Sequence, residues 1–193
     1  MKEGKNGVTS KTPENILFGA GTIHRGLKYT KDGGWNFAES VIGATSGGSK
    51  LSIVPEIYYP EIDGVPVKLK ETATKVGETA TMEINFIELT KEIILASTLG
   101  AMGTSDDTTF DLIESKSDIV DGDFLENIAF VGKTLKGKNI IAILDNALCT
   151  NGFEQEGKSK EGTIGKYTFE CHAGIEDLEL DKLPWRIYYP KAA

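Results

Sequence analysis

The chain has 193 residues, 39% hydrophobic and 26% charged, a composition typical of a globular protein and unlike that of a disordered or membrane chain. Its 21 basic and 29 acidic side chains give a net charge of −8, which argues against nucleic-acid binding through phosphate neutralisation. The longest candidate for a membrane span, residues 93–99, is far shorter than the roughly 20 residues that cross a bilayer. We therefore expect no membrane partner.

The N-terminus indicates the compartment. Residues 1–6 are polar and lack the apolar core of a signal peptide, which predicts synthesis and retention in a cytoplasm. In that compartment Cys149 and Cys171 are expected to be two free thiols in neighbouring strands. Cys171 and His172 are adjacent in a predicted strand and point to opposite faces. With His24 as the other histidine, the sequence has no spaced set of metal ligands, so we expect no metal and no cofactor.

Charge is unevenly distributed along the chain. Residues 1–50 hold seven basic and four acidic side chains, whereas residues 101–131 hold eight acidic and one basic. One interpretation is a solvated acidic surface with a basic N-terminal arm; the other is two surfaces of opposite charge that meet between copies. The acidic run that contains Asp118, Asp121, Asp123 and Glu126 lacks the Asp-x-Asp-x-Asp-Gly calcium pattern, which favours a solvated loop.

In chain order, residues 1–13 are predicted to form a flexible N-terminal arm. Residues 15–23 resemble a strand. Residues 26–49 have little regular signal and two glycine-rich turn clusters, and they predict a long protruding loop. Because this loop also carries apolar side chains, we expect it to become buried between subunits. Those side chains are Trp35, Phe37, Val41 and Ile42.

Strand patterns return at residue 51 and extend beyond Pro55, and Asp63-Gly64 predicts a tight hairpin turn. Residues 79–89 alternate most clearly. One face is apolar and buried, with Ala80, Met82, Ile84 and Phe86; the other is polar and wet, with Thr79, Thr81, Glu83 and Asn85.

A helix of about ten residues follows this strand. Thr90 is its predicted N-cap, Glu92 lies in the first turn, and Gly100 is the predicted C-cap. Its apolar stripe indicates packing on a sheet.

The second half reads as strands again, with a hairpin turn at residues 134–139. The predicted strands begin at Phe110, Leu125, Asn139, Gly165 and Trp185. No linker divides the chain. We expect one mainly-β domain over residues 1–193, a β-sandwich or barrel with one flanking helix.

Motifs for catalysis are weak. Gly19-Ala-Gly21 fails the spacing of a dinucleotide loop, and residues 43–50 lack the Gly-Lys-Ser/Thr order of a phosphate loop. Neither His24 nor His172 lies near a nucleophile elbow. We expect no catalytic residues and no enzyme activity.

Several segments, taken in order, resemble the major tail (tube) proteins of long-tailed bacteriophages of Gram-positive hosts. They are residues 42–56, Asp63-Gly64 with residues 67–70, residues 80–90 with the helix, and residues 125–132 and 140–148. The resemblance spans residues 15–150 and is one of order and texture.

The resemblance implies a virion structural protein that is made in the bacterial cytoplasm and ends in the virion tail. Its subunits form hexameric rings whose inner strands join into a barrel, and the rings stack into a tube for DNA ejection. The implied partners are other copies, the tape measure and terminator proteins, and DNA in transit. One polar face would line the lumen: Thr79, Thr81, Glu83 and Asn85, with Lys68 and Lys70 as further candidates from the adjacent hairpin.

An alternative is a β-sandwich that binds a carbohydrate or another ligand. Its stacking platforms would be Trp35, Tyr58, Tyr59 or Trp185. Such a module gathers its aromatic side chains on one face and remains a monomer, whereas the tube protein assembles into rings.

Overall fold

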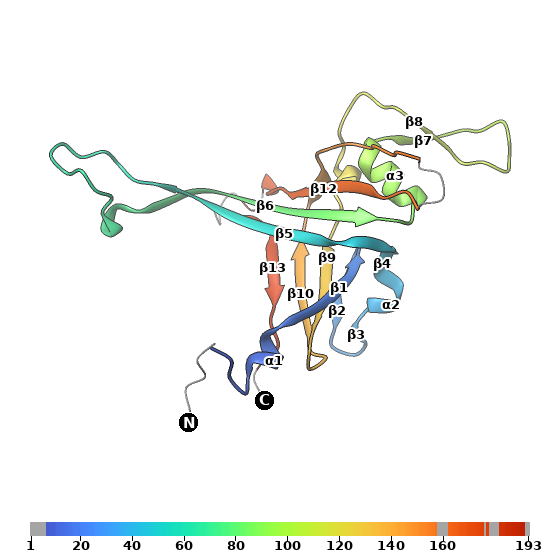
Figure 1. Cartoon of the computed structure of the whole chain (residues 1–193). Helices are drawn as coiled ribbons and strands as arrows, with labels where there is room; N and C mark the ends of the chain where they lie inside the picture. Colours follow the sequence, from blue (N-terminus) through green and yellow to red (C-terminus); the bar gives the residue numbers. More distant parts are fainter. Residues whose placement is uncertain (1–6, 158–161, 176, 178–181, 192–193) are drawn as a thin grey trace.

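Two antiparallel sheets pack against each other and cross at a steep angle in the computed structural model of the chain (Figure 1). The structure describes residues 7–157, 162–175, 177 and 182–191. The fold is mainly β with several antiparallel sheets and few helices, as the sequence predicts.

The five-stranded sheet has the order β13-β10-β9-β1-β4, and the four-stranded sheet has the order β11-β12-β6-β5. The strands of the first sheet are β13 (Trp185–Tyr188), β10 (Asn139–Leu144), β9 (Ile128–Thr134), β1 (Leu17–His24) and β4 (Val41–Gly43). Those of the second sheet are β11 (Ala147–Cys149), β12 (Gly165–Cys171), β6 (Thr74–Phe86) and β5 (Thr45–Tyr58). Two small ribbons pair β2 (Tyr29–Thr30) with β3 (Gly34–Trp35), and β7 (Ala101–Gly103) with β8 (Leu112–Glu114).

The helices are short. They are α1 (Thr12–Asn15), α2 (Phe37–Ser40) and α3 (Lys91–Thr98), together with the 3₁₀ turns η1 (Lys70–Thr72) and η2 (Asp121–Asp123). Of the predicted N-terminal arm, residues 1–6 lie outside the described residues, and Thr12 and Pro13 already belong to α1.

The main core lies between the two sheets. From β6 it takes the predicted apolar face, Ala80, Met82, Ile84 and Phe86, all buried. Ile23, Ile128 and Leu144 of the other sheet face them in the same cluster. The predicted division of the strand into a buried and a wet face is confirmed, because its polar residues are exposed or only half-buried.

The predicted helix is α3, which contributes Ile93 and Ala96 to the core. The Thr90 hydroxyl accepts a hydrogen bond from the Ile93 N–H at 3.3 Å, which confirms the N-cap. The predicted C-cap is wrong by one residue. Leu99, with φ +50°, takes the left-handed conformation, and Gly100 follows it and donates its N–H to the Leu95 carbonyl.

A second, smaller core lies on the other face of the five-stranded sheet. Ala129, Val131, Ile141 and Ile143 are buried there under Leu27. The covering aromatic side chains are Trp35 and Phe37. Both faces of β9 and β10 are therefore apolar and covered.

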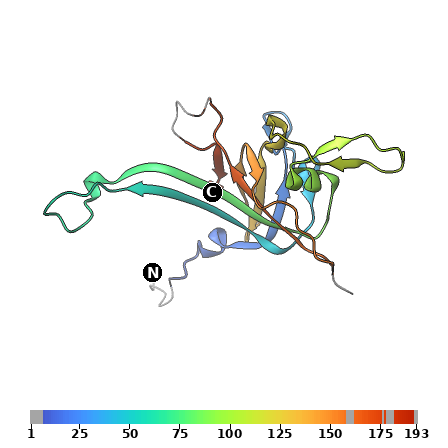
Figure 2. The same ribbon diagram turned by 90° about the horizontal axis from the view of Figure 1, so that it is seen from above.

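This second core corrects the expectation of a long protruding loop over residues 26–49. The segment folds as β2, β3, α2, β4 and the start of β5. It is tied down by backbone hydrogen bonds from Gly26 to the Glu126 carbonyl at 3.0 Å and from Arg25 to the Ser40 carbonyl at 2.7 Å. The protruding part of the molecule is instead the hairpin of β5 and β6 (Figures 1 and 2).

Several predicted strand boundaries move in the structure. The strand expected from Asn139 to Leu148 divides into β10 and β11, because Asn146 has a φ of +46°. The β9–β10 turn is confirmed: Thr134 donates its N–H to the Lys138 carbonyl at 2.9 Å, and Gly137 has a φ of +77°. Gly19 and Gly21 lie within β1, where the register with β9 shifts.

Candidate functional site

The outstanding surface feature is the distal part of the β5–β6 hairpin. β12 pairs with β6 only over residues 81–86, so beyond Thr81 the hairpin is a two-stranded ribbon. We call residues 53–80 the arm. Figure 2 shows it extending well beyond the two sheets, and its pairing continues from Ile53–Ala80 out to Tyr58–Thr74.

The sequence allows a ribbon here because β5 is an edge strand. Pro55, which has no N–H to donate, is tolerated at an edge. The register shifts between Glu56 and Ile57, where β6 carries an extra residue, and such a bulge bends and twists the pair.

The arm exposes far more apolar surface than a two-stranded ribbon in water should. Two-stranded hairpins are marginally stable at best without a covered face. Its exposed large apolar side chains are Val54, Ile57, Tyr58, Ile62, Val65, Val67, Leu69 and Val76. Val67 is the most exposed of them, at 67%. Exposed apolar side chains gathered on one hairpin are typical of interaction surfaces.

The arm is held at its root by a partly buried carboxylate. Glu78 accepts hydrogen bonds from Lys75 Nζ at 2.6 Å and from the indole N–H of Trp185 at 2.7 Å. The hydrogen bond from Lys75 holds the pKa of Glu78 below its ordinary value. Because Trp185 belongs to β13, this contact fixes the arm to the five-stranded sheet.

At the far end, residues 59–73 join β5 to β6 around a hollow of about 700 Å³. The predicted turn is present, since Gly64 has a φ of +78° and Val65 donates its N–H to the Ile62 carbonyl at 3.0 Å. It lies inside a longer loop, so the expected tight hairpin is wrong. Lys68 stacks over Tyr59, with Nζ 4.7 Å from the ring centroid.

The predicted lumen residues fall into two groups. Thr79, Thr81, Glu83 and Asn85 lie on the face of β6 that points away from the core, where Lys50 Nζ binds Glu83 at 2.6 Å. Lys68 and Lys70 lie instead at the tip of the arm, away from that face.

Cross-strand partners complete the polar face of the four-stranded sheet. Lys166, Thr168 and Glu170 of β12 lie opposite Asn85, Glu83 and Thr81 in the β12–β6 register. On β5, Lys50 and Ser52 lie opposite Glu83 and Thr81. Two lysines and two glutamates are thus interspersed over the face, which is close to neutral and wet. The alternation in β6 predicted this face, but the contribution of β12 depended on a pairing that the sequence does not specify.

The four residues expected in an inter-subunit loop do not act as one group. Trp35 stacks with Phe37 at 6.1 Å between ring centroids and contacts Tyr188 edge-on at 4.9 Å. Ile42 is buried in the main core, whereas Val41 is 51% exposed. Trp35 and Phe37 are therefore packing residues of this subunit, and contact with a neighbour remains a prediction for Val41.

His24 is buried behind this segment. Ser40 donates its hydroxyl to the Asn36 carbonyl at 2.8 Å, so its oxygen accepts from Nδ1–H of His24 at 2.9 Å. Thr22 then donates to Nε2 at 2.7 Å. Burial lowers the pKa of His24. The histidine thus joins β1 to α2 as a neutral ring with both ring nitrogens hydrogen-bonded.

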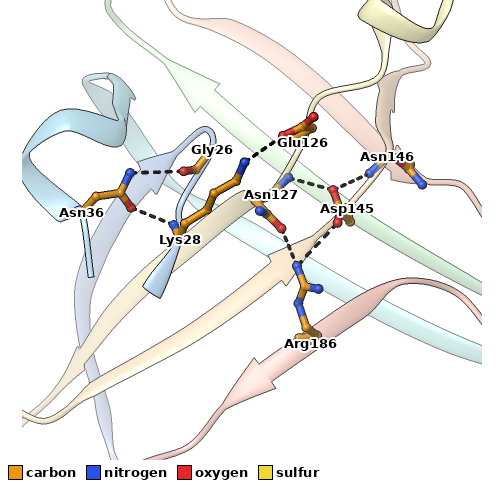
Figure 3. A network of polar contacts seen from close by, with 8 residues as sticks. All are labelled: Gly26, Lys28, Asn36, Glu126, Asn127, Asp145, Asn146 and Arg186. Atoms are coloured by element: carbon orange, nitrogen blue, oxygen red, sulfur yellow. Dashed lines mark hydrogen bonds and ion pairs between the residues drawn. The ribbon is translucent and has the colours of Figure 1, made fainter. Parts of the chain in front are cut away.

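A polar network closes one end of the sandwich (Figure 3). The Asp145 carboxylate accepts the backbone N–H groups of Asn127 and Asn146, each at 3.1 Å. Arg186 of β13 lies 3.6 Å from Asp145 and donates to the Asn127 side chain. Asn127 and Asn146 both have positive φ, at +47° and +46°. The network fixes the strand ends at which the chain passes between the sheets.

Beside this network, a second set of contacts holds the covering segment (Figure 3). Asn36 accepts from the Lys28 backbone N–H at 2.7 Å and donates to the Gly26 carbonyl at 3.3 Å, while Lys28 Nζ binds Glu126 at 3.1 Å. Sequence reasoning missed both sets, and Asn36 and Asp145 carry no local signal for them.

The aromatic residues of the carbohydrate-binding alternative are dispersed. Trp35 lies on the covered face of the five-stranded sheet, and Trp185 is bound to Glu78 at the root of the arm. Tyr58 and Tyr59 are on the arm. The structure does not bring these four rings to one face.

Groups suited to metal binding are not gathered in the described part of the chain. Within residues 7–157, 162–175, 177 and 182–191, no group of three or more His, Cys, Asp or Glu side chains could hold a metal ion. Cys149 and Cys171 are free and buried in the neighbouring strands β11 and β12, as predicted. Burial raises the pKa of the Cys149 thiol above its ordinary value. It also raises the pKa of the Cys171 thiol, to about 12.

No protein-family model matches the chain, and no curated protein matches its sequence. Among the described residues, no helix is long and apolar enough to cross a membrane.

Proposed function

We propose that this protein is a structural subunit that assembles with copies of itself into stacked rings, as in the tail tube of a long-tailed bacteriophage. The observation that carries the proposal is the arm. It projects from the sheets and exposes eight large apolar side chains that a second molecule would cover.

The order of the four-stranded sheet supports closure into a ring. All adjacent strands in this sheet pair antiparallel, so its edge strands β5 and β11 run in opposite directions. When copies stand side by side in the same orientation, β5 of one copy can pair antiparallel with β11 of the next. That pairing would use the part of β11 beyond Ala147, because the N–H and C=O of Ala147 already bond to Leu125 at 3.0 and 2.8 Å. The five-stranded sheet has an odd number of strands, so its edges β4 and β13 run the same way and would meet in parallel.

Antiparallel pairing is the slightly more stable of the two, and a head-to-tail interface forms a ring where the rotation closes. The four-stranded sheet is therefore the better candidate for the ring wall. Joining its edges would also remove the open edge of β5, which is otherwise a template for uncontrolled pairing.

The polar face of that sheet would line the channel. Its lysines, Lys50 and Lys166, are balanced by Glu83 and Glu170. A nearly neutral wall, in a chain with a net charge of −8, suits DNA that slides through without binding. In this proposal the protein is made in the bacterial cytoplasm, and its partners are other copies, the tape measure and terminator proteins, and DNA in transit.

Negative-stain microscopy and light scattering of the purified protein test the proposal. We expect rings or tubes at high protein concentration. In an arm truncation, Asn-Gly replaces residues 57–76, so that a favoured two-residue turn joins Glu56 to Gly77, which already face each other. This variant should fold and remain monomeric.

Matched point variants separate the arm from general surface effects. Val67→Asp on the arm should impair assembly, whereas Ile175→Asp, at a site that is 88% exposed and away from the arm, should not. Strictly monomeric wild-type protein at all concentrations would contradict the proposal. Tubes formed by the truncated variant would show that the arm is not the contact.

A further inference from the structure

The two ends of the molecule, taken along the direction of β9, differ in charge. β9 runs from the acidic segment that precedes it to the β9–β10 turn, so these lie at opposite ends of the molecule (Figure 1). α1 packs beside the turn, where Leu135 donates its N–H to the Ile16 carbonyl at 3.0 Å.

We define the basic end by the residues around this turn and α1. It comprises Lys11, Lys133, Lys136 and Lys138 with the exposed apolar side chains Ile16, Leu17, Leu135 and Tyr189. The acidic end is the β7–β8 ribbon with the segment that follows it. It comprises Asp106, Glu114, Asp118 and Asp121 with the exposed apolar side chains Phe110, Ile119 and Val120.

The carboxylates of the acidic end are not neutralised within the subunit. Elsewhere in the same segment, Asp111 pairs with Lys91, Asp123 with Lys116 and Glu126 with Lys28. The four that define the end are exposed and form no ion pair with any residue that the structure describes.

The lysines of the basic end are similarly available. Lys133 and Lys136 are exposed and have no ion-pair partner in the described part of the chain. Lys138 donates its Nζ to the Lys191 carbonyl at 3.4 Å and forms no ion pair with any described residue. Glu14 also lies at this end, in a shallow hollow with Lys11 and Lys138, and it reduces but does not cancel the positive charge.

Apolar surface accompanies both charges. Phe110 at the acidic end is 70% exposed, and the basic end exposes Leu135 and Tyr189. Apolar centres with charged surroundings of opposite sign are the pattern of complementary protein surfaces.

We propose that the basic end of one copy docks on the acidic end of the next. This inference rests on the proposed self-assembly and adds its direction: like ends repel, so copies stack head to tail and a two-fold end-to-end dimer is disfavoured. Because the two surfaces are different and lie at opposite ends of the molecule, the contact can repeat from copy to copy as an open head-to-tail stack.

Charge reversal tests the docking. Lys133→Glu/Lys136→Glu makes both ends acidic, and Asp106→Lys/Asp118→Lys/Asp121→Lys makes both ends basic. Each variant alone should need about tenfold more protein than the wild type to form stacks, measured by sedimentation and light scattering. The control is Lys182→Glu, a charge reversal at an exposed position outside both ends and off the channel face, which should stack like the wild type.

Mixing provides the decisive comparison. Equal amounts of the two reversed variants should stack together, because each acidic end then meets a basic one. A single chain with all five substitutions should also stack alone. Circular dichroism of each variant verifies folding. Two variants that had lost stacking by misfolding would not regain it when mixed.

Salt gives an independent readout. Since exposed charges are screened over about 8 Å at physiological ionic strength, stacking of the wild type should weaken as salt rises. Reversed variants that stack like the control, or a mixture without rescue, would overturn the docking while rings formed by the wild type uphold self-assembly. Wild-type protein that forms neither rings nor stacks would overturn both.

Discussion

Trp185 and Glu78 lie 107 positions apart in the chain, and the indole N–H of Trp185 donates a 2.7 Å hydrogen bond to the Glu78 carboxylate. The contact joins β13 of one sheet to the root of the arm in the other. It determines where the hairpin leaves the body of the protein and how firmly its first residues are held.

Replacing Trp185 by Phe should therefore loosen the arm. The ring remains, but the donor to a charged acceptor is lost, which should lower the free energy of unfolding by about 1.5–3 kcal/mol. Urea unfolding measures the loss, and amide exchange in residues 74–80 should accelerate. In a double-mutant cycle with Glu78→Gln, a coupling energy within about 0.3–0.5 kcal/mol of zero would contradict the role of this hydrogen bond.

His24 should make the stability depend on pH. Burial lowers its pKa in the folded protein below the ordinary value of 6.5, so the unfolded chain binds a proton more readily. The contribution of the neutral His24 ring to the stability is fully present above pH 6.5. It is lost as the pH falls from 6.5 through the lowered pKa. Thermal unfolding between pH 5 and 8 measures this, and His24→Gln should flatten the profile in that window. An unchanged slope in the variant would assign the pH dependence to other groups.

The two faces of β6 should respond oppositely to substitution. Phe86 is 2% exposed, so Phe86→Asp buries an unpaired charge and should cost several kcal/mol, enough to prevent folding. Glu83→Lys removes an exposed ion pair with Lys50 and should change stability by no more than about 1 kcal/mol. Soluble expression and urea unfolding compare the two. A folded Phe86→Asp protein would show that the core tolerates a charged side chain at this position.

Trp35 should behave as a core residue of the subunit. It is half-buried over the five-stranded sheet, and Trp35→Ala should lower the stability of the monomer by up to about 3 kcal/mol, with Trp35→Phe as a milder control. Urea unfolding under monomeric conditions measures the effect. If the alanine variant kept wild-type stability and lost only assembly, the original expectation of an inter-subunit contact would be restored.

Local sequence patterns predicted the elements whose residues alternate strongly. Ala80, Met82 and Ile84 alternate with polar neighbours over a long stretch, so period and burial agree in β6. The helix start was equally predictable, because Thr90 caps its own turn. The helix end was not predictable from local sequence. Glycine is the residue that most readily adopts the left-handed conformation, so Gly100 was expected there, but Leu99 takes that conformation in the structure.

Residues 26–49 were mispredicted because their structure depends on a distant surface. β2 and β3 have two residues each, too few for any periodic signal. A signal lay elsewhere, in the unbroken apolar run of residues 140–144. A strand that is apolar on both faces needs a cover on each, and one sheet can supply only one. The arm was missed for a related reason. The extension of the strand beyond Pro55 was predicted, but the sequence does not indicate where β12, the strand that pairs with the other side of β6, ends.

The two buried thiols bear on where this protein can persist. Oxidants attack the thiolate, and burial of Cys149 and Cys171 with raised pKa values keeps both groups protonated and shielded at neutral pH. The covalent state of the folded chain should therefore remain the same in a reducing cytoplasm and in an oxidising medium outside a cell. A particle built from such subunits could pass from one to the other without chemical repair.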